Sequence, residues 1–315
     1  MIENKKYTKE SIFLDENWAH QKYYGWKIIY KDTKNNLLLK SFLFINRYLL
    51  LSIDSSKEEI VDIVNKIRYP KWLSYLVVHD FSGKDLSNVL IKNTYPSQST
   101  EDNLIFFDKT LVVDLRKNEE ELWNDLSKEY RRKCDKAMKL GIIVKKINSN
   151  DLYDLELFYK EYLLFSKQKM IQVVSLEILK KMVSNNDLII FKSTLDGNIL
   201  STILVYTANK KSIFLYGMNH EKVNNGNGQY IHWKIIEYLK ENNYVSYDLC
   251  GIRSTDMNDG LYKFKSGFTS NLVDLGNEWH SNSPLIDKIK PVYKNYCIGR
   301  DLWVKNVLKK LFFLF

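Results

Sequence analysis

Three strand-like segments, followed by a helix and a further strand, constrain the fold of this chain most strongly. A helix is expected over residues 228–242 and a buried strand over residues 244–249, because apolar residues recur there at the spacing of each element. The three preceding strands are rich in β-branched and aromatic residues and are separated by short polar turns. They are DLIIFKSTL, ILSTILVYTA and KSIFLYGMN, at residues 187–195, 199–208 and 211–219. The order predicts a sheet with a packed helix in the C-terminal half.

Strands and helices also alternate through the first half of the chain. A helix at residues 55–69 has Ser56 as its N-cap and Glu59 three residues later. A longer helix is expected from Asn118 to Leu140, closed by Gly141. The other expected elements are strands at 26–32, 37–45, 48–53, 72–80, 109–115 and 142–147, and helices at 152–169 and 175–183. This pattern predicts an α+β first domain followed by a second cycle of strands and helices.

The composition favours a globular chain without a membrane span. Its 315 residues, 45% of them hydrophobic, suit two domains of ordinary size. The longest apolar runs fall short of the roughly 20 residues that cross a bilayer, and the N-terminus does not resemble a secretory signal, so a cytoplasmic location is expected. Cys134, Cys250 and Cys297 lie far apart, which favours neither a zinc site nor a disulfide framework. The net charge of +9 suggests a polyanionic neighbour.

Three motifs in register carry a resemblance to a known family. The strand YVSYDLCGI at residues 244–252 precedes LYKFKSGF at residues 261–268, which is similar to the YDxxG(I) and FKxGF pattern of the Fem-type peptidoglycan aminoacyltransferases, a group related to GNAT acyltransferases. Residues 122–146 resemble that family's basic helix and following strand, and residues 18–27 its N-terminal signature. The resemblance implies an α+β / α/β fold of two tandem GNAT-like domains, with mixed central sheets flanked by helices. The expected divisions are 1–145, 146–283 and a tail at 284–315 that packs back on the first domain.

Lys265 and Asp248 are the expected catalytic residues. A lysine held between Phe264 and Phe268 would stabilise a phosphate or a developing oxyanion near low-dielectric surface, and the resemblance implies contact with the donor or the transition state. Asp248 ends a strand where α/β folds open their ligand crevice, so it could orient the acceptor amine or accept its proton. The alternatives are a solvent-facing lysine on an alternating strand and an aspartate that caps the following turn.

A glycine-containing loop before the helix at 228–242 is the expected donor site. Its candidate residues are Gly226, Asn227, Gly228 and Gln229. Glycines there let backbone N–H groups approach a pyrophosphate, and the helix N-terminus adds partial positive charge. The loop is similar to the GNAT sequence Q/R-x-x-G-x-G, although Val223 occupies the Q/R position and Fem-type loops are not usually glycine-rich. A flexible turn is the alternative, and the donor stays open between acyl-CoA or acyl-carrier and aminoacyl-tRNA.

The acceptor is expected to meet a basic helix face and several aromatic side chains. Arg131 and Arg132 are the preferred contacts for the phosphates of a nucleotide-sugar, a lipid-linked pyrophosphate or tRNA, with a merely solvated face as the alternative. His220 and His232 lack metal spacing and are expected to be structural. The remaining cations of the face are Lys128, Lys133, Lys136 and Lys139, and the other candidate substrate contacts are Tyr216, Tyr247, Phe264 and Phe268.

These expectations together describe an N-acyl or aminoacyl transferase that forms an amide on a cell-envelope glycan precursor, either nucleotide-linked or lipid-linked. It would use acyl-CoA, an acyl-carrier or aminoacyl-tRNA as co-substrate, with no tightly bound cofactor or metal. The alternatives are an acyl-CoA-dependent or acyl-carrier-dependent GNAT enzyme acting on a small amine or amino sugar, and a non-catalytic phospholigand-binding protein. Residues 299–315 are amphipathic, so peripheral contact with the inner membrane face is the alternative to their packing on the first domain.

Overall fold

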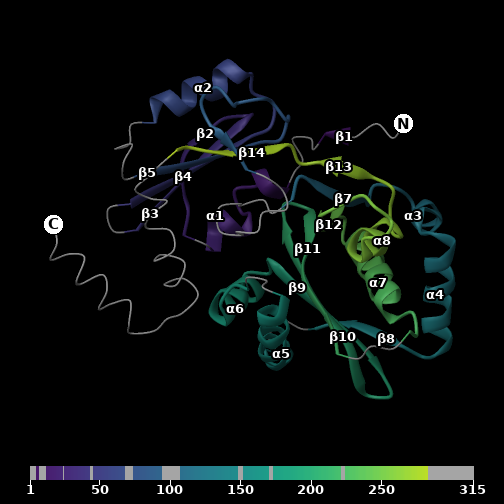
Figure 1. The fold of residues 1–315 in the computed structure, drawn as a ribbon. Helices are drawn as coiled ribbons and strands as arrows, with labels where there is room; N and C mark the ends of the chain where they lie inside the picture. Colours follow the sequence, from purple (N-terminus) through teal and green to yellow (C-terminus); the bar gives the residue numbers. More distant parts are fainter. Residues whose placement is uncertain are drawn as a thin grey trace. The chain divides into compact units, whose positions relative to one another are not determined.

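The computed structural model describes residues 5–6, 12–23, 25–42, 45–67, 74–93, 107–147, 152–169, 173–220 and 224–282. The chain forms two compact units, each with a sheet of its own (Figure 1). Unit 1 combines Met1–Gly25 with Phe107–Leu275, and unit 2 combines Trp26–Phe106 with Gly276–Phe315. Within the described residues, no helix is both long and apolar enough to cross a membrane.

The sheet of unit 1 has eight strands in the order β1-β13-β7-β12-β11-β10-β9-β8. Its centre is the predicted meander, in which β10 pairs antiparallel with both β9 and β11. Both turns place two consecutive residues at positive φ, Asp196 with Gly197 and Asn209 with Lys210, as two-residue hairpin turns require. The strands are β1 (Lys5–Lys6), β7 (Lys109–Asp114), β8 (Ile143–Lys146), β9 (Leu188–Leu195), β10 (Asn198–Ala208), β11 (Lys211–Asn219), β12 (Ser246–Ile252) and β13 (Leu272–Asp274).

Helices cover both faces of this sheet. Figure 1 shows α5 and α6 on one side of β9–β11 and α4 and α7 on the other. The core on the α7 side includes Ile231, Ile235 and Leu239, all fully buried or nearly so, against strand residues and α4. The helices are α1 (Ala19–Tyr23), α3 (Glu119–Asp125), α4 (Lys128–Lys139), α5 (Tyr153–Lys169), α6 (Leu176–Ser184), α7 (Asn227–Glu241) and α8 (Gly260–Ser266), with a 3₁₀ turn at Ile12–Leu14.

The sheet of unit 2 has six strands in the order β2-β3-β4-β5-β14-β6. Helix α2 (Lys57–Lys66) carries the predicted capping box of Ser56 and Glu59 and buries Ile60 and Val64 against the sheet. The strands are β2 (Lys27–Lys31), β3 (Asn35–Phe42), β4 (Ile45–Ser52), β5 (Ser74–Asp80), β6 (Ile91–Lys92) and β14 (Asn277–His280). Two mixed sheets flanked by helices confirm the predicted fold class.

Local structure departs from expectation at three places. The compact units do not follow the boundary expected after residue 145, because β7 pairs with β12 and β13, and α4 packs on α7. The helix expected from Asn118 to Leu140 is two helices, since Ser127 caps the start of α4 through its hydroxyl. Most of residues 261–268 form helix α8, capped by Asp259, so Lys265 does not lie on an alternating strand. The tail at 284–315, with Cys297, lies outside the described residues.

Candidate functional site

Strands β11 and β12 separate halfway along their length. They pair in parallel from Lys211 with Ser246 to Ile213 with Asp248, and in the described chain no register pair joins them further on. Strand β11 then continues along β10 to Asn219, while β12 continues along β7. We call this feature the β11/β12 divergence. Beyond Ile213, in the part of the chain that the structure describes, one edge of β11 has no paired strand on the β12 side. The backbone N–H and C=O groups of such an edge can hydrogen-bond a ligand that lies between the two strands.

A bulge in β12 begins at the divergence. The register of β12 against β7 shifts between Asp248 and Gly251, and Cys250 has φ of 67°. Asp248 is 1% exposed and accepts hydrogen bonds from the backbone N–H of Cys250, at 2.7 Å, and from the Thr110 hydroxyl. These contacts make Asp248 the cap of the bulge, which is the structural role left open for it from sequence.

Lys265 holds the same bulge from the other side. Its side chain is buried with 4% exposure, and its ammonium donates to the carbonyls of Cys250 at 2.9 Å and Gly251 at 2.7 Å. Burial lowers its pKa below the usual lysine value, while Cys250 and Asp248 act in the opposite direction. The lysine is therefore neither solvent-facing nor on a strand, and it fixes the backbone at the point where β12 leaves β11.

Aromatic rings surround Lys265 on the α7 side. His232 on α7 contacts the rings of Phe264 at 5.5 Å and Phe268 at 5.1 Å, and its Nδ1 lies 3.0 Å from the Tyr247 hydroxyl. Burial, with a smaller contribution from Lys265, lowers the pKa of His232 to about 3, so the ring is neutral. Tyr247 is 0% exposed and Phe268 is 1% exposed. Both belong to the core, whereas Phe264 is only partly buried.

The glycine loop packs against α4. Gly226 has φ of 83°, and a Cβ there would lie 2.1 Å from the carbonyl oxygen of Lys133, so close helix packing explains this glycine without a ligand. The ammonium of Lys136 donates to the carbonyl of Asn224 at 2.8 Å. The loop is thus held against α4. Gly228 lies beside Phe264, because a Cβ added at Gly228 would lie 3.8 Å from the ring.

Asn227 and Gln229 complete the expected donor residues. The Asn227 amide donates to the Ser201 hydroxyl at 2.6 Å, and this hydroxyl donates to Asn219. Gln229 hydrogen-bonds the Tyr130 hydroxyl, and this bond partly opposes the burial that raises the pKa of Tyr130 to about 12. All four expected donor residues therefore have neighbours within unit 1, and Asn227 is linked through Ser201 to Asn219 at the end of β11.

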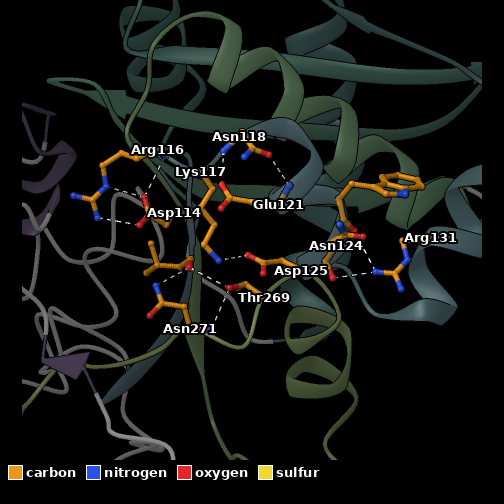
Figure 2. Close-up of polar contacts among 12 residues, drawn as sticks. Asp114, Arg116, Lys117, Asn118, Glu121, Asn124, Asp125, Arg131, Thr269 and Asn271 are labelled. Carbon is orange, nitrogen blue, oxygen red and sulfur yellow. Dashed lines mark hydrogen bonds and ion pairs between the residues drawn. The ribbon is translucent and has the colours of Figure 1, made fainter.

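Arg131 and Arg132 have different surroundings, although they are neighbours in α4. Arg131 donates to the carbonyls of Leu126 at 2.7 Å, Asn124 at 3.0 Å and Trp123 at 3.4 Å, which satisfies the C-terminal end of α3 (Figure 2). Arg132 is exposed. The guanidinium of Arg131 is thus engaged by backbone carbonyls, whereas the Arg132 side chain is open to solvent.

The opposite face of the sheet brings Tyr216, expected as a substrate contact, and His220, expected to be structural, together with Glu161 and Thr202, which the sequence did not single out. Tyr216 on β11 contacts the ring of Tyr162 on α5 at 5.2 Å. One residue away, Glu161 Oε2 lies 2.7 Å from His220 Nδ1, and His220 Nε2 lies 3.1 Å from the Thr202 hydroxyl. The sequence did not predict this group because its members come from helix α5, from strand β10 and from the end of strand β11, which meet only in the folded chain. Among the described residues, no cluster of His, Cys, Asp and Glu could hold a metal ion.

Comparisons with known proteins find a family that part of the chain resembles. Residues 166–276, which contain β9 to β13 and the divergence, match the FemAB family. A 124-residue stretch is 33% identical to the aminoacyltransferase FemB of Staphylococcus epidermidis and covers 36% of this chain and 28% of that protein. The chain therefore spans less than a third of the length of the curated relatives it matches.

Solved structures extend the likeness over most of the chain, as fold alone. The crystal structure of FemX has a TM-score of 0.61 at 15% identity, covering 87% of this chain and 92% of that one. A C-terminal domain of a lysylphosphatidylglycerol synthetase from Agrobacterium fabrum has a TM-score of 0.50 at 10% identity, with 85% of this chain and 87% of that one covered. Residues 166–276 are thus similar to the FemAB family, and the fold of most of the chain is similar to that of FemX.

Proposed function

We propose that the protein is an aminoacyl or N-acyl transferase that forms an amide on an amino group of a cell-envelope glycan precursor. The FemAB match supports this assignment because it covers the strands that diverge, and the similar FemB is named an aminoacyltransferase. Attack of an amine on an activated acyl group needs positioning, deprotonation and stabilisation of the developing oxyanion. It needs neither a covalent enzyme intermediate nor a metal.

The observation that carries the proposal is the β11/β12 divergence and its fixed bulge. Beyond Ile213 the edge of β11 is positioned to accept an extended donor arm much as a sheet accepts an added strand. The bulge directs the backbone around Cys250 away from β11, and a rigid bulge would hold the donor carbonyl at one depth. Backbone N–H groups along the edge of β11 beyond Ile213 are suitable donors to an oxyanion held at that depth.

We assign Lys265 and Asp248 positioning roles in this reaction. Their polar atoms contact the bulge itself, at the carbonyls of Cys250 and Gly251 and the N–H of Cys250. Without these two side chains the backbone of the bulge would change conformation, and the donor carbonyl would no longer be held at one position along β11. Tyr247 and Phe268 support this arrangement from the core, while Phe264 lies where it could also meet the donor.

For the donor we favour aminoacyl-tRNA over acyl-CoA. Packing against Lys133 accounts for Gly226, so the glycine loop no longer points specifically to a coenzyme A pyrophosphate. The backbone of Gly228 and Gln229 at the start of the 15-residue helix α7 remains available for a donor phosphate of either kind in this proposal. Arg132, Lys128 and Lys139 give α4 an exposed basic face that suits the phosphates of a tRNA or of a nucleotide-linked acceptor.

A transfer assay with mass detection tests the proposal. The purified protein is incubated with aminoacyl-tRNA from a charged total pool or with a set of acyl-CoAs, and with nucleotide-linked or lipid-linked muropeptide precursors as acceptors. We expect the acceptor to gain the mass of one aminoacyl or acyl group, only with active protein. Stabilisation of the fold by a precursor without any mass gain would support the phospholigand-binding alternative. Absence of both transfer and stabilisation across the set would contradict the proposal.

A further inference from the structure

Glu161, His220 and Thr202 form a chain of polar contacts that joins a carboxylate, an imidazole and a hydroxyl. The Glu161 carboxylate lies 2.7 Å from Nδ1 of His220, and the Thr202 hydroxyl lies 3.1 Å from Nε2. A carboxylate only accepts hydrogen bonds, so the partners assign the ring proton to Nδ1 in the neutral imidazole. Nε2 then carries the lone pair, and the Thr202 hydroxyl donates to it. This arrangement orients a histidine to take up a proton at Nε2.

The position of this group relates it to the divergence. His220 directly follows β11, and its N–H continues the ladder to Leu200. Alternation along an extended strand places its side chain on the same face as Tyr216, which contacts Tyr162. Glu161 directly precedes Tyr162 on α5, so this helix supplies both the carboxylate beside His220 and the ring beside Tyr216. The base is therefore at the end of the strand whose free edge is proposed to bind the donor.

Burial also suits a base that works away from bulk water. The His220 side chain is 13% exposed and that of Glu161 is 41% exposed, while Thr202 is 3% exposed. The hydroxyl and most of the ring are sheltered, yet one side of the pair remains accessible. A histidine that only links a surface helix to a strand end needs a partner at one ring nitrogen, whereas His220 has a carboxylate at Nδ1 and a hydroxyl at Nε2. A purely structural role is still compatible with these contacts. The distinction can be measured.

Resting on the proposed transferase function, we propose that His220 is the catalytic base that takes the proton of the attacking amine, with Glu161 as the residue that positions it. The uncharged amine attacks the donor carbonyl, and a carbon–nitrogen bond forms. Its N–H donates to Nε2 in place of the Thr202 hydroxyl, and the proton passes to His220. The carbon–oxygen bond to the tRNA ribose, or the carbon–sulfur bond of a thioester, breaks. The imidazolium returns the proton to the leaving oxygen or sulfur, which restores the neutral ring.

The test compares two acceptors in the full-length protein. An alkyl amine such as the side chain of a muropeptide lysine is strongly basic, so its adduct with the donor carbonyl holds the N–H proton and needs a base to remove it. Hydroxylamine is a much weaker base, so its adduct loses that proton more readily and depends less on His220. We expect His220→Gln to slow transfer to the amine by about 10²-fold or more and to change hydroxamate formation much less. Glu161→Gln should show the same selective loss, and Glu161→Asp should recover part of it. Glu156→Gln, a carboxylate on the same helix that pairs with Lys180, is the matched control.

A second readout is independent of turnover. The ¹⁵N shifts of His220 should report Nδ1–H in the wild type and a mixture of tautomers in Glu161→Gln. Equal losses with both acceptors, or no loss in His220→Gln, would overturn the assignment while leaving the transferase function intact. If the wild type transfers to neither acceptor from any donor, the proposed function fails and the role of His220 falls with it.

Discussion

Replacement of Lys265 by methionine tests whether the bulge depends on one buried ammonium. Methionine keeps the length and the apolar part of the side chain but removes the donors to the carbonyls of Cys250 and Gly251. A buried group left without its partner costs about 1–3 kcal/mol, so two carbonyls give about 2–6 kcal/mol. Burial of the charged Lys265 side chain itself costs free energy, and methionine removes this cost, which offsets part of the lost stability. We expect the free energy of unfolding to fall by about 2–4 kcal/mol.

Urea unfolding followed by far-UV circular dichroism measures this loss, and amide hydrogen exchange along β12 localises it. Lys263→Met is the matched control, because Lys263 is exposed on the same helix and its replacement should change the free energy of unfolding by less than about 0.5 kcal/mol. Exchange should quicken more in β12 of the Lys265 variant than in β9. Equal unfolding curves for the two variants would refute the reasoning that the ammonium holds the bulge.

Three further changes test other parts of the structure. The pKa of His232 is about 3 when folded and near 6.5 otherwise, so the unfolded state binds the extra proton between these values. Stability measured by urea unfolding should therefore fall as the pH drops through that window, by up to about 1.4 kcal/mol per pH unit, and His232→Asn should flatten the slope. Arg131→Gln should destabilise the protein by about 1–3 kcal/mol, whereas Arg132→Gln should instead weaken acceptor or donor binding in a direct titration; the opposite pattern would contradict the capping role. Gly226→Ala should lower the melting temperature well beyond Gly197→Ala, since both have positive φ but a Cβ meets nothing within 4 Å at Gly197.

The elements that the sequence predicted well are those specified by neighbouring residues. The meander was predictable because its turns contain Asp-Gly and Asn-Lys pairs at positive φ between apolar runs. Helix α2 was predictable because its capping box lies within four residues. The lateral order of the strands was not predictable from the sequence, because β7 and β12 pair although they lie more than a hundred residues apart. The alternation of apolar residues within each strand does not specify which strand is its neighbour.

The site divides in the same way. The motif around Asp248 and Lys265 predicted that these residues act together, and the fold does bring both to one bulge, whose geometry only the folded chain shows. The break between α3 and α4 had a local signal in Ser127, yet the apolar stripe continues through it and favoured one long helix. Glu161, Thr202 and His220 come from three separate elements, and no spacing in the sequence connects them.

The place of β14 has a consequence for synthesis on the ribosome. This strand lies between β5 and β6 in the sheet of unit 2, although all of Phe107–Leu275 is translated after β6 and before β14. Until residues 277–280 have left the ribosome, β5 lacks its neighbour along His79 and Asp80, which are fully buried in the finished protein. Most of unit 2 is thus translated before most of unit 1, yet unit 2 is completed last. A nascent chain stalled before β14 would present an open strand edge, a state prone to misassembly and a natural client for a chaperone.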